Sequence, residues 1–228
     1  MESTSRNDTF PPLETVDEMG GKPEYVELAK TARDKTKDCL KMYDEDSWKL
    51  FRDKRGVTTW TIPTSGSKVP TIKRYMEVEA SLQHTLDFLK DNDNANKICK
   101  KYIESVCVEK INENNRFEKN VISGVWPIIR KRDTSLFVHQ INMEDGRVLF
   151  QLFSAEHKDI PETKATRAQC DLCYFELTPI SENKTGVGSI IYCDSKGWLS
   201  KCFIKAQVEF QHEEFESMKK LIEKGTTK

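Results

Sequence analysis

The sequence predicts an α+β fold in which about nine antiparallel strands are combined with a long C-terminal helix. Two patterns indicate this. Six consecutive strand-like runs follow one another with no helix between them, and parallel pairing would require crossover connections that are absent. After these runs, apolar residues recur at helical spacing through the last thirty or so positions. The length of 228 residues suits one large domain.

The first half of the chain contains helices and three strands. Residues 1–22 are polar, with Pro11-Pro12 and Gly20-Gly21, and we expect them to be mobile. Residues 23–43 are rich in helix formers and begin with Pro23, which suits a first helical turn. Three short strand-like runs are predicted next, at 47–56, 57–63 and 69–80. A helix over 81–93, capped by Ser81, and a shorter one over 95–101 complete this half.

The middle of the chain is a meander of strands separated by turn signals such as Asn114-Asn115 and Asp145-Gly146. Its six predicted strands lie within 102–112, 116–126, 134–143, 147–157, 167–177 and 186–194.

The final helix carries an apolar stripe. Leu199, Phe203, Ala206 and Phe210 fall at spacings of four, three and four residues. After a polar interruption at 211–214 the stripe continues through Phe215, Met218 and Ile222. Such a face either fills the concavity of a curved sheet as ordinary core or covers a bound ligand.

Composition excludes several classes of function. The net charge of -1 does not indicate a polyanion, and we expect no nucleic-acid partner. No window is long and apolar enough for a membrane span or a signal peptide, so we expect a cytoplasmic protein. No nucleotide or metal motif is evident, and we expect no cofactor.

The cysteines agree with a reducing compartment. There are seven, at scattered positions without the spacing of a disulfide framework. Cys170 and Cys173 form a CxxC motif, but residues three apart on a strand point to opposite faces. We therefore interpret them as ordinary half-buried thiols.

Three stretches resemble one family. They are GVTTWTIPTSGSKVPTIKRYMEVEASLQHTLDFLKDND, VWPIIRKRDTSLFVHQINMEDGRVLFQLFSAEH with its Trp126-Pro127, Arg132-Asp133 and Phe137, and KGWLSKCFIKAQ before the last helix. In order and spacing they are similar to the START family, the steroidogenic acute regulatory protein-related lipid transfer domains, and most to its phosphatidylcholine-transfer-protein-like members. The resemblance runs from about residue 48 to residue 225, within a single domain over 23–228.

The resemblance implies a helix-grip fold, in which the sheet curls around the last helix and encloses a tunnel for one lipid. It implies a non-catalytic, monomeric lipid carrier that exchanges its lipid, most simply a phospholipid, by transient contact with membrane surfaces. A sensor of the same shape for a small hydrophobic ligand is the alternative. A hydrolase is disfavoured, because the chain has no Gly-x-Ser-x-Gly elbow.

The resemblance also implies lipid-binding residues. The phosphate-binding Arg of the phosphatidylcholine carriers falls on Asn96, and their cage Trp falls on Cys99. One cage Tyr falls on Leu89 and the other is retained as Tyr174, so we expect no selectivity for choline. Tyr102 lies close to these positions in the sequence and is included with them.

Two further polar sites have open interpretations. Arg132 and Asp133 form either an ion pair inside the tunnel or a structural fixture at the start of a strand. His139 either projects into the tunnel or is a hydrogen-bonded core group.

On the last helix we expect Leu199, Phe203, Ala206 and Phe210 to face the lipid. The predicted membrane contacts are Trp198, Lys201 and Lys205.

Overall fold

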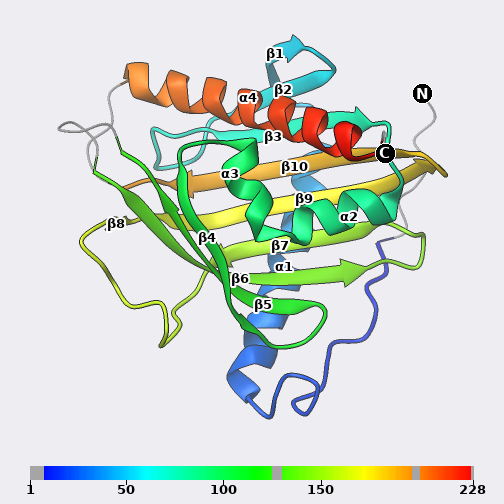
Figure 1. Ribbon diagram of the computed structural model, residues 1–228, viewed down its shortest axis with the longest axis vertical. Helices are drawn as coiled ribbons and strands as arrows, with labels where there is room; N and C mark the ends of the chain where they lie inside the picture. The colour runs from blue at the N-terminus through cyan, green and yellow to red at the C-terminus, as the bar shows by residue number, and fades with distance from the viewer. Residues whose placement is uncertain (1–7, 125–129, 197–200, 227–228) are drawn as a thin grey trace.

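The computed structural model describes residues 8–124, 130–196 and 201–226. For residues 201–203 it describes the helical backbone but not the side chains. Ten strands form one sheet, and the predicted α+β architecture is confirmed (Figure 1). The strands are β1 (Lys49–Lys54), β2 (Val57–Ile62), β3 (Thr71–Val78), β4 (Tyr102–Lys110), β5 (Asn115–Ile122), β6 (Arg132–Asn142), β7 (Val148–Ser154), β8 (Thr166–Arg167), β9 (Gln169–Ser181) and β10 (Lys184–Asp194).

The helices follow local sequence signals. Helix α1 spans Pro23–Tyr43 as predicted, with Pro23 in its first turn. Helix α2 (Leu82–Lys90) begins after Ser81, whose side chain accepts a hydrogen bond from the His84 backbone N–H. The expected helix over 81–93 ends at Lys90 and is followed by a short 3₁₀ turn, η1 (Asn92–Asn94). The shorter helix expected over 95–101 is α3 (Ala95–Ile98). The final helix, α4, spans Lys201–Gly225.

The sheet has the order β1-β2-β3-β10-β9-β7-β6-β5-β4. Every pair along this path is antiparallel, as the absence of crossover helices predicts. The exception is the two-residue β8, which lies beside the start of β6 in parallel. Because β3 pairs with β10, the first three strands and the last strand of the chain are neighbours.

The two faces of the sheet are covered by different helices (Figure 1). Helix α1 packs on one face, which we call the α1 face, where its Ala29 and Ala32 belong to one buried apolar cluster with Phe117 and Phe137. Helices α2, α3 and α4 lie over the opposite face, which we call the cavity face. There the second half of α4 is anchored by buried Phe215, Met218 and Ile222. Phe215 and Ile222 of this half of the apolar stripe are therefore core.

The segment that precedes α1 lies against the rest of the protein. We expected residues 1–22 to be mobile, but within the described residues 8–22 the side chain of Met19 is fully buried against the α1 face. Arg33 of α1 donates hydrogen bonds to the backbone carbonyls of Pro11 and Pro12. These contacts hold the segment along α1.

Within the described residues, none of the helices combines the length and apolar character needed to cross a membrane.

Candidate functional site

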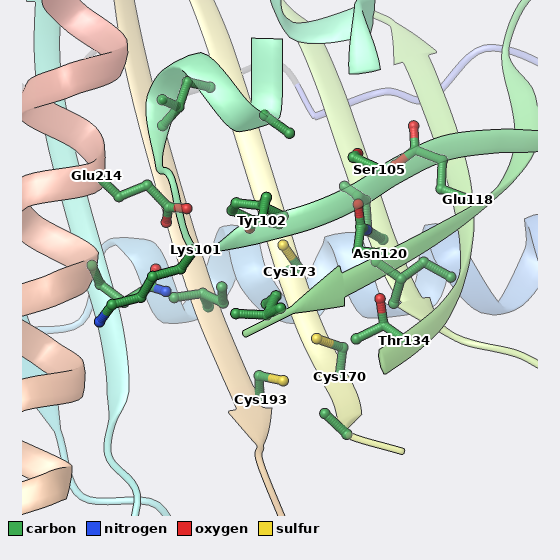
Figure 2. A pocket seen from close by; sticks show the side chains of 18 of the residues that line it. Lys101, Tyr102, Ser105, Glu118, Asn120, Thr134, Cys170, Cys173, Cys193 and Glu214 are labelled. Carbon is green, nitrogen blue, oxygen red and sulfur yellow. The ribbon is translucent and has the colours of Figure 1, made fainter. Parts of the chain in front are cut away.

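A cavity of about 630 Å³ lies between the cavity face of the sheet and the first half of α4 (Figure 2). Helices α2 and α3 and strand β4 form its remaining wall. The lining is mainly apolar and includes Phe88, Leu136, Val138, Phe150, Leu152 and Phe175. This size and character are those of a site for a small apolar or amphipathic molecule.

A buried arginine connects the sheet to α4 at one side of the cavity. Nε of Arg74 on β3 donates to Ser189 Oγ at 2.9 Å, and its Nη1 donates to the backbone carbonyl of Gln211 at 3.0 Å and to Gln211 Oε1 at 2.9 Å. The same Nη1 lies 3.7 Å from Oε2 of Glu214. Residues 211–214, the polar interruption of the apolar stripe, therefore fasten α4 over the cavity.

Tyr102 adds a third member to this group. Both Tyr102 and Glu214 line the cavity, where their side chains interact electrostatically (Figure 2). The pKa of Tyr102 is raised well above its ordinary value, first by the negative charge of Glu214 and second by burial. Burial also raises the pKa of Glu214, against the opposing effects of Arg74 and Tyr102. These groups satisfy one another and leave the apolar part of the cavity to a ligand.

A cation–π contact lies beside this group. Nζ of Lys101 is 4.3 Å from the centroid of the Phe210 ring, and both side chains line the cavity. Phe210 thereby contributes apolar surface to the cavity and a contact between α4 and the start of β4.

A second polar group lies across β4, β5 and β6, away from α4. Ser105, Asn120 and Thr134 are paired in register on these three strands, and all three line the cavity (Figure 2). We call them the polar row. Thr134 is only 6% exposed, and its Oγ1 has no hydrogen-bond partner within the described part of the chain. An unsatisfied buried hydroxyl is costly, and a ligand atom would satisfy it.

An ion pair lies next to the polar row on β5. Nε of Arg116 donates to Oε1 of Glu118 at 2.7 Å, and both side chains line the cavity while being almost fully buried. Each charge is therefore compensated by the other.

Three thiols line the same end of the cavity as Thr134: Cys170, Cys173 and Cys193 (Figure 2). The expectation that Cys170 and Cys173 point to opposite faces is wrong. The register of β9 against β10 shifts between the pairs Leu172–Tyr192 and Cys170–Cys193, so Asp171 has no partner. Such a bulge adds a residue to one strand and restores both cysteines to one face.

The thiols have the character of buried structural groups. Burial raises the pKa of Cys173 to about 12. A hydrogen bond with Cys193, and then burial, raises the pKa of Cys170 well above its ordinary value. No cluster of three or more His, Cys, Asp or Glu suited to a metal ion occurs in residues 8–124, 130–196 and 201–226.

The structure brings some of the predicted lipid-binding residues together at the cavity and leaves others outside it. Those that line it are Leu89, Tyr102, Arg132, Ala206 and Phe210. Those that do not are Asn96, Cys99, Asp133, His139 and Tyr174.

Three of these residues, His139, Tyr174 and Asp133, lie on the opposite face of the sheet. His139 is fully buried on the α1 face, where it accepts a hydrogen bond from Arg33 Nε at 3.3 Å and its Nδ1 lies 2.7 Å from Asn115 Oδ1. It is a hydrogen-bonded core group, and its projection into the tunnel is ruled out. Tyr174 packs beneath α1 with Cys39 and Leu40, and its hydroxyl donates to Glu176.

Arg132 and Asp133 do not pair with each other, because adjacent strand residues point to opposite faces. Asp133 on the α1 face binds Arg167 Nε at 2.9 Å and Thr163 Oγ1 at 2.9 Å. Arg132 on the cavity face donates to three backbone carbonyls, those of Arg130, Ser195 and Lys196. It therefore joins the start of β6 to the segment that follows the end of β10.

The remaining predictions concern the start of α4. Trp198 and Leu199 lie outside the described residues, as do Trp126 and Pro127 of the sequence motif, and the side chains of Lys201 and Phe203 are not described. Lys205 and Ala206 are exposed, although Ala206 also borders the cavity.

Sequence reasoning missed Arg74, the polar row and the Arg116–Glu118 pair. One signal was available for Arg74, since Ile72, Arg74, Met76 and Val78 alternate along β3 and place the arginine among apolar residues. The polar row depends on the pairing registers of three strands, which cannot be read from the sequence.

The structure is similar to several solved structures. Human StAR-related lipid transfer protein 5 superposes with a TM-score of 0.79 at 16% identity, over 88% of this chain and 99% of that chain. The human StarD13 (DLC2) lipid transfer and protein localization domain gives a TM-score of 0.68 at 15% identity, over 80% and 92%. The STAR-related lipid transfer protein (fragment 25-204) from Xanthomonas axonopodis gives 0.65 at 15% identity, over 78% and 99%.

No protein-family model and no curated protein matches the sequence. The similarity is therefore one of fold, and it covers nearly the whole of the related domains. The chain has the helix-grip fold of the StAR-related lipid transfer domains.

Proposed function

We propose that the protein is a non-catalytic lipid carrier that holds one lipid in the cavity beneath α4 and exchanges it between membranes. The observation that carries this proposal is the apolar cavity of about 630 Å³, which is closed on one side by a helix with an amphipathic face. A lipid chain gains about 0.8 kcal/mol for each methylene that is removed from water, so a carrier must enclose most of its cargo.

The size of the cavity favours a lipid with one chain or a compact ring system. At about 30 Å³ for each water-sized group, the cavity accommodates on the order of twenty non-hydrogen atoms. The roughly thirty methylenes of a two-chain phospholipid exceed that number before the headgroup is counted. A phospholipid would require the cavity to expand, for instance by movement of α4.

The side chains that line the cavity support a binding role over catalysis. None of the described lining residues is a histidine, so Ser105 and the cysteines have no imidazole base beside them. The pKa values of Cys170 and Cys173 are raised, whereas a nucleophilic thiol requires a lowered pKa.

Exchange would take place at the α4 side. Lys205 is exposed on the first half of this helix, where it can approach anionic headgroups while Phe210 faces the cavity. The placement of Asn96, Cys99 and Tyr174 outside the cavity supports the expectation that choline is not selected.

A vesicle-to-vesicle assay with fluorescent lipids tests the proposal. Donor vesicles would contain, in separate runs, a labelled fatty acid, a sterol or a phospholipid, and no nucleotide, metal or other cofactor would be added. We expect transfer of at least one class well above the spontaneous rate. Transfer at the spontaneous rate for all three classes would contradict the carrier function.

The sensor alternative predicts a different result. A protein that binds lipid without transporting it would retain the lipid through gel filtration but would not accelerate its arrival in acceptor vesicles. Native mass spectrometry of the purified protein, run beside the transfer assay, separates the two roles.

A further inference from the structure

The hydrogen-bonding groups at the β4–β6 end of the cavity have spare donors. The Thr134 hydroxyl has no partner in the described chain and is 94% removed from solvent. The Ser105 hydroxyl accepts a hydrogen bond from Asn92 Nδ2 at 3.2 Å, which leaves its own proton to donate. Asn120, between them in register, brings an amide with two further N–H groups. The polar row can therefore surround an atom that accepts hydrogen bonds.

Positive charge is available at the same end. Arg132 lies two residues before Thr134 on the same face of β6, which places the two Cα atoms about 7 Å apart. A guanidinium has five N–H donors, and three are used by the carbonyls of Arg130, Ser195 and Lys196. Burial lowers the pKa of Arg132, and no described carboxylate contributes an opposing effect.

The other two arginines of the cavity are already paired with carboxylates, and Lys101 lies against the Phe210 ring at the α4 side. Arg74 lies against Glu214, and Arg116 binds Glu118 at 2.7 Å. Glu118 also lines the cavity, two residues before Asn120 on the same face of β5. Its carboxylate accepts a hydrogen bond from Arg116, which neutralises its charge. Arg132 is thus the cavity-lining arginine that a ligand anion can approach without displacing a protein carboxylate.

We propose, resting on the carrier function above, that the ligand is a long-chain fatty acid whose carboxylate lies at the polar row, with Arg132 supplying the compensating charge. The chain would extend toward α4 along Leu136, Val138, Phe150 and Phe175. A fatty acid of about eighteen carbons has about the twenty non-hydrogen atoms that the cavity accommodates. A carboxylate accepts up to about four hydrogen bonds, which matches a group of donors.

Equilibrium binding of oleic acid and methyl oleate to the full chain tests this assignment at pH 8, with both ligands delivered from cyclodextrin. The two ligands share one chain, but the ester carries no charge. We expect the wild type to bind the acid at least about tenfold more tightly, the magnitude of one hydrogen bond to a charged group. Thr134→Val and Arg132→Gln should each reduce this acid-to-ester ratio several-fold.

Two control variants separate the head from the chain. Thr134→Ser keeps the hydroxyl and should keep the ratio. Leu136→Ala removes chain contact and should weaken the acid and the ester equally. Thermal unfolding of each variant without ligand checks that the variant is folded. If Thr134→Val does not fold, Asn120→Leu takes its place as the variant of the polar row.

Parallel vesicle assays with cholesterol and with phosphatidylcholine distinguish this proposal from the carrier function. If the wild type extracts either lipid but does not discriminate oleic acid from its ester, the carrier function stands and the carboxylate site is wrong. An undiminished ratio in Thr134→Val and Arg132→Gln would equally overturn the site. If no lipid of any class is bound, the carrier function itself is wrong.

Discussion

The guanidinium carbon of Arg74 on β3 lies 4.3 Å from the ring centroid of Phe215 on α4. Together with the hydrogen bonds from Arg74 to Gln211, this contact joins the sheet to the helix at the boundary between cavity and core. On one side of Arg74 the helix covers a cavity, and on the other it packs as core.

Replacing Arg74 should destabilise the protein strongly. Arg74→Met leaves the Glu214 carboxylate buried without its cation, and we expect the free energy of unfolding to fall by about 3–5 kcal/mol. The double variant Arg74→Met with Glu214→Leu should lose less, because no uncompensated charge remains. Urea unfolding measures both, and a double variant less stable than Arg74→Met would contradict the pairing.

The two phenylalanines of α4 should behave differently. Phe210 lines the cavity, whereas Phe215 is fully buried in the core. Phe215→Ala should lower the free energy of unfolding by about 3–5 kcal/mol. Phe210→Ala should lower it by much less but release bound lipid faster. Measurements of melting temperature and lipid retention on both variants show whether Phe210 faces a cavity. Equal destabilisation by the two changes would indicate a solid core beneath α4.

His139 should make the protein less stable as the pH falls. Its pKa is lowered to about 4, first by burial, while Arg33 lowers it further and Glu14 opposes. The unfolded chain therefore binds the proton more readily, and stability is lost as the pH falls from about 6.5 toward 4. Between pH 7 and pH 5 we expect a loss of about 2 kcal/mol from this group.

His139→Gln provides the control for that pH dependence. Glutamine can accept from Arg33 and donate to Asn115 without titrating. Urea unfolding at pH 7 and pH 5 should show a smaller decrease for this variant than for the wild type. Equal decreases would mean that other groups, such as His212, carry the effect.

The cavity thiols should resist alkylation in the folded protein. The pKa of Cys173 is raised to about 12 and that of Cys170 is also raised, and the thiolate is the reactive form. Among the six cysteines whose side chains are described, iodoacetamide at pH 8, followed by peptide mapping, should modify the exposed Cys107 first. Cys170 and Cys173 should react only in urea. Rapid native labelling of Cys173 would show that the cavity is open to water.

The sequence predicts the positions of helices and strands better than it predicts which face of the sheet each strand residue occupies. Helix α1 and the Ser81 cap depend on local signals, and the structure confirms both. Strand β6 is different, because residues 133–141 are all buried. Alternation disappears where both faces of a sheet are covered, so the sequence could not decide whether His139 faces α1 or the cavity.

The candidate site depends on irregularities and on register. The bulge at Asp171 reverses the inference drawn from the spacing of Cys170 and Cys173. The polar row requires that Ser105, Asn120 and Thr134 meet across three strands, and a shift of one residue would turn any of them to the other face. Such positions are set by tertiary pairing and not by local propensity.

The pairing of β3 with β10 has a consequence for the order in which the chain folds during synthesis. Val78 pairs with Thr185, so the ribosome must add about a hundred residues before β3 gains its second neighbour. At about 5–20 residues per second, this edge waits for about 5–20 s. Helix α4 follows β10, so it can cover the cavity only when almost the whole chain has emerged from the ribosome. The apolar lining on β4–β9 is therefore synthesised before the helix that covers it, and in the nascent chain it remains exposed until α4 has emerged.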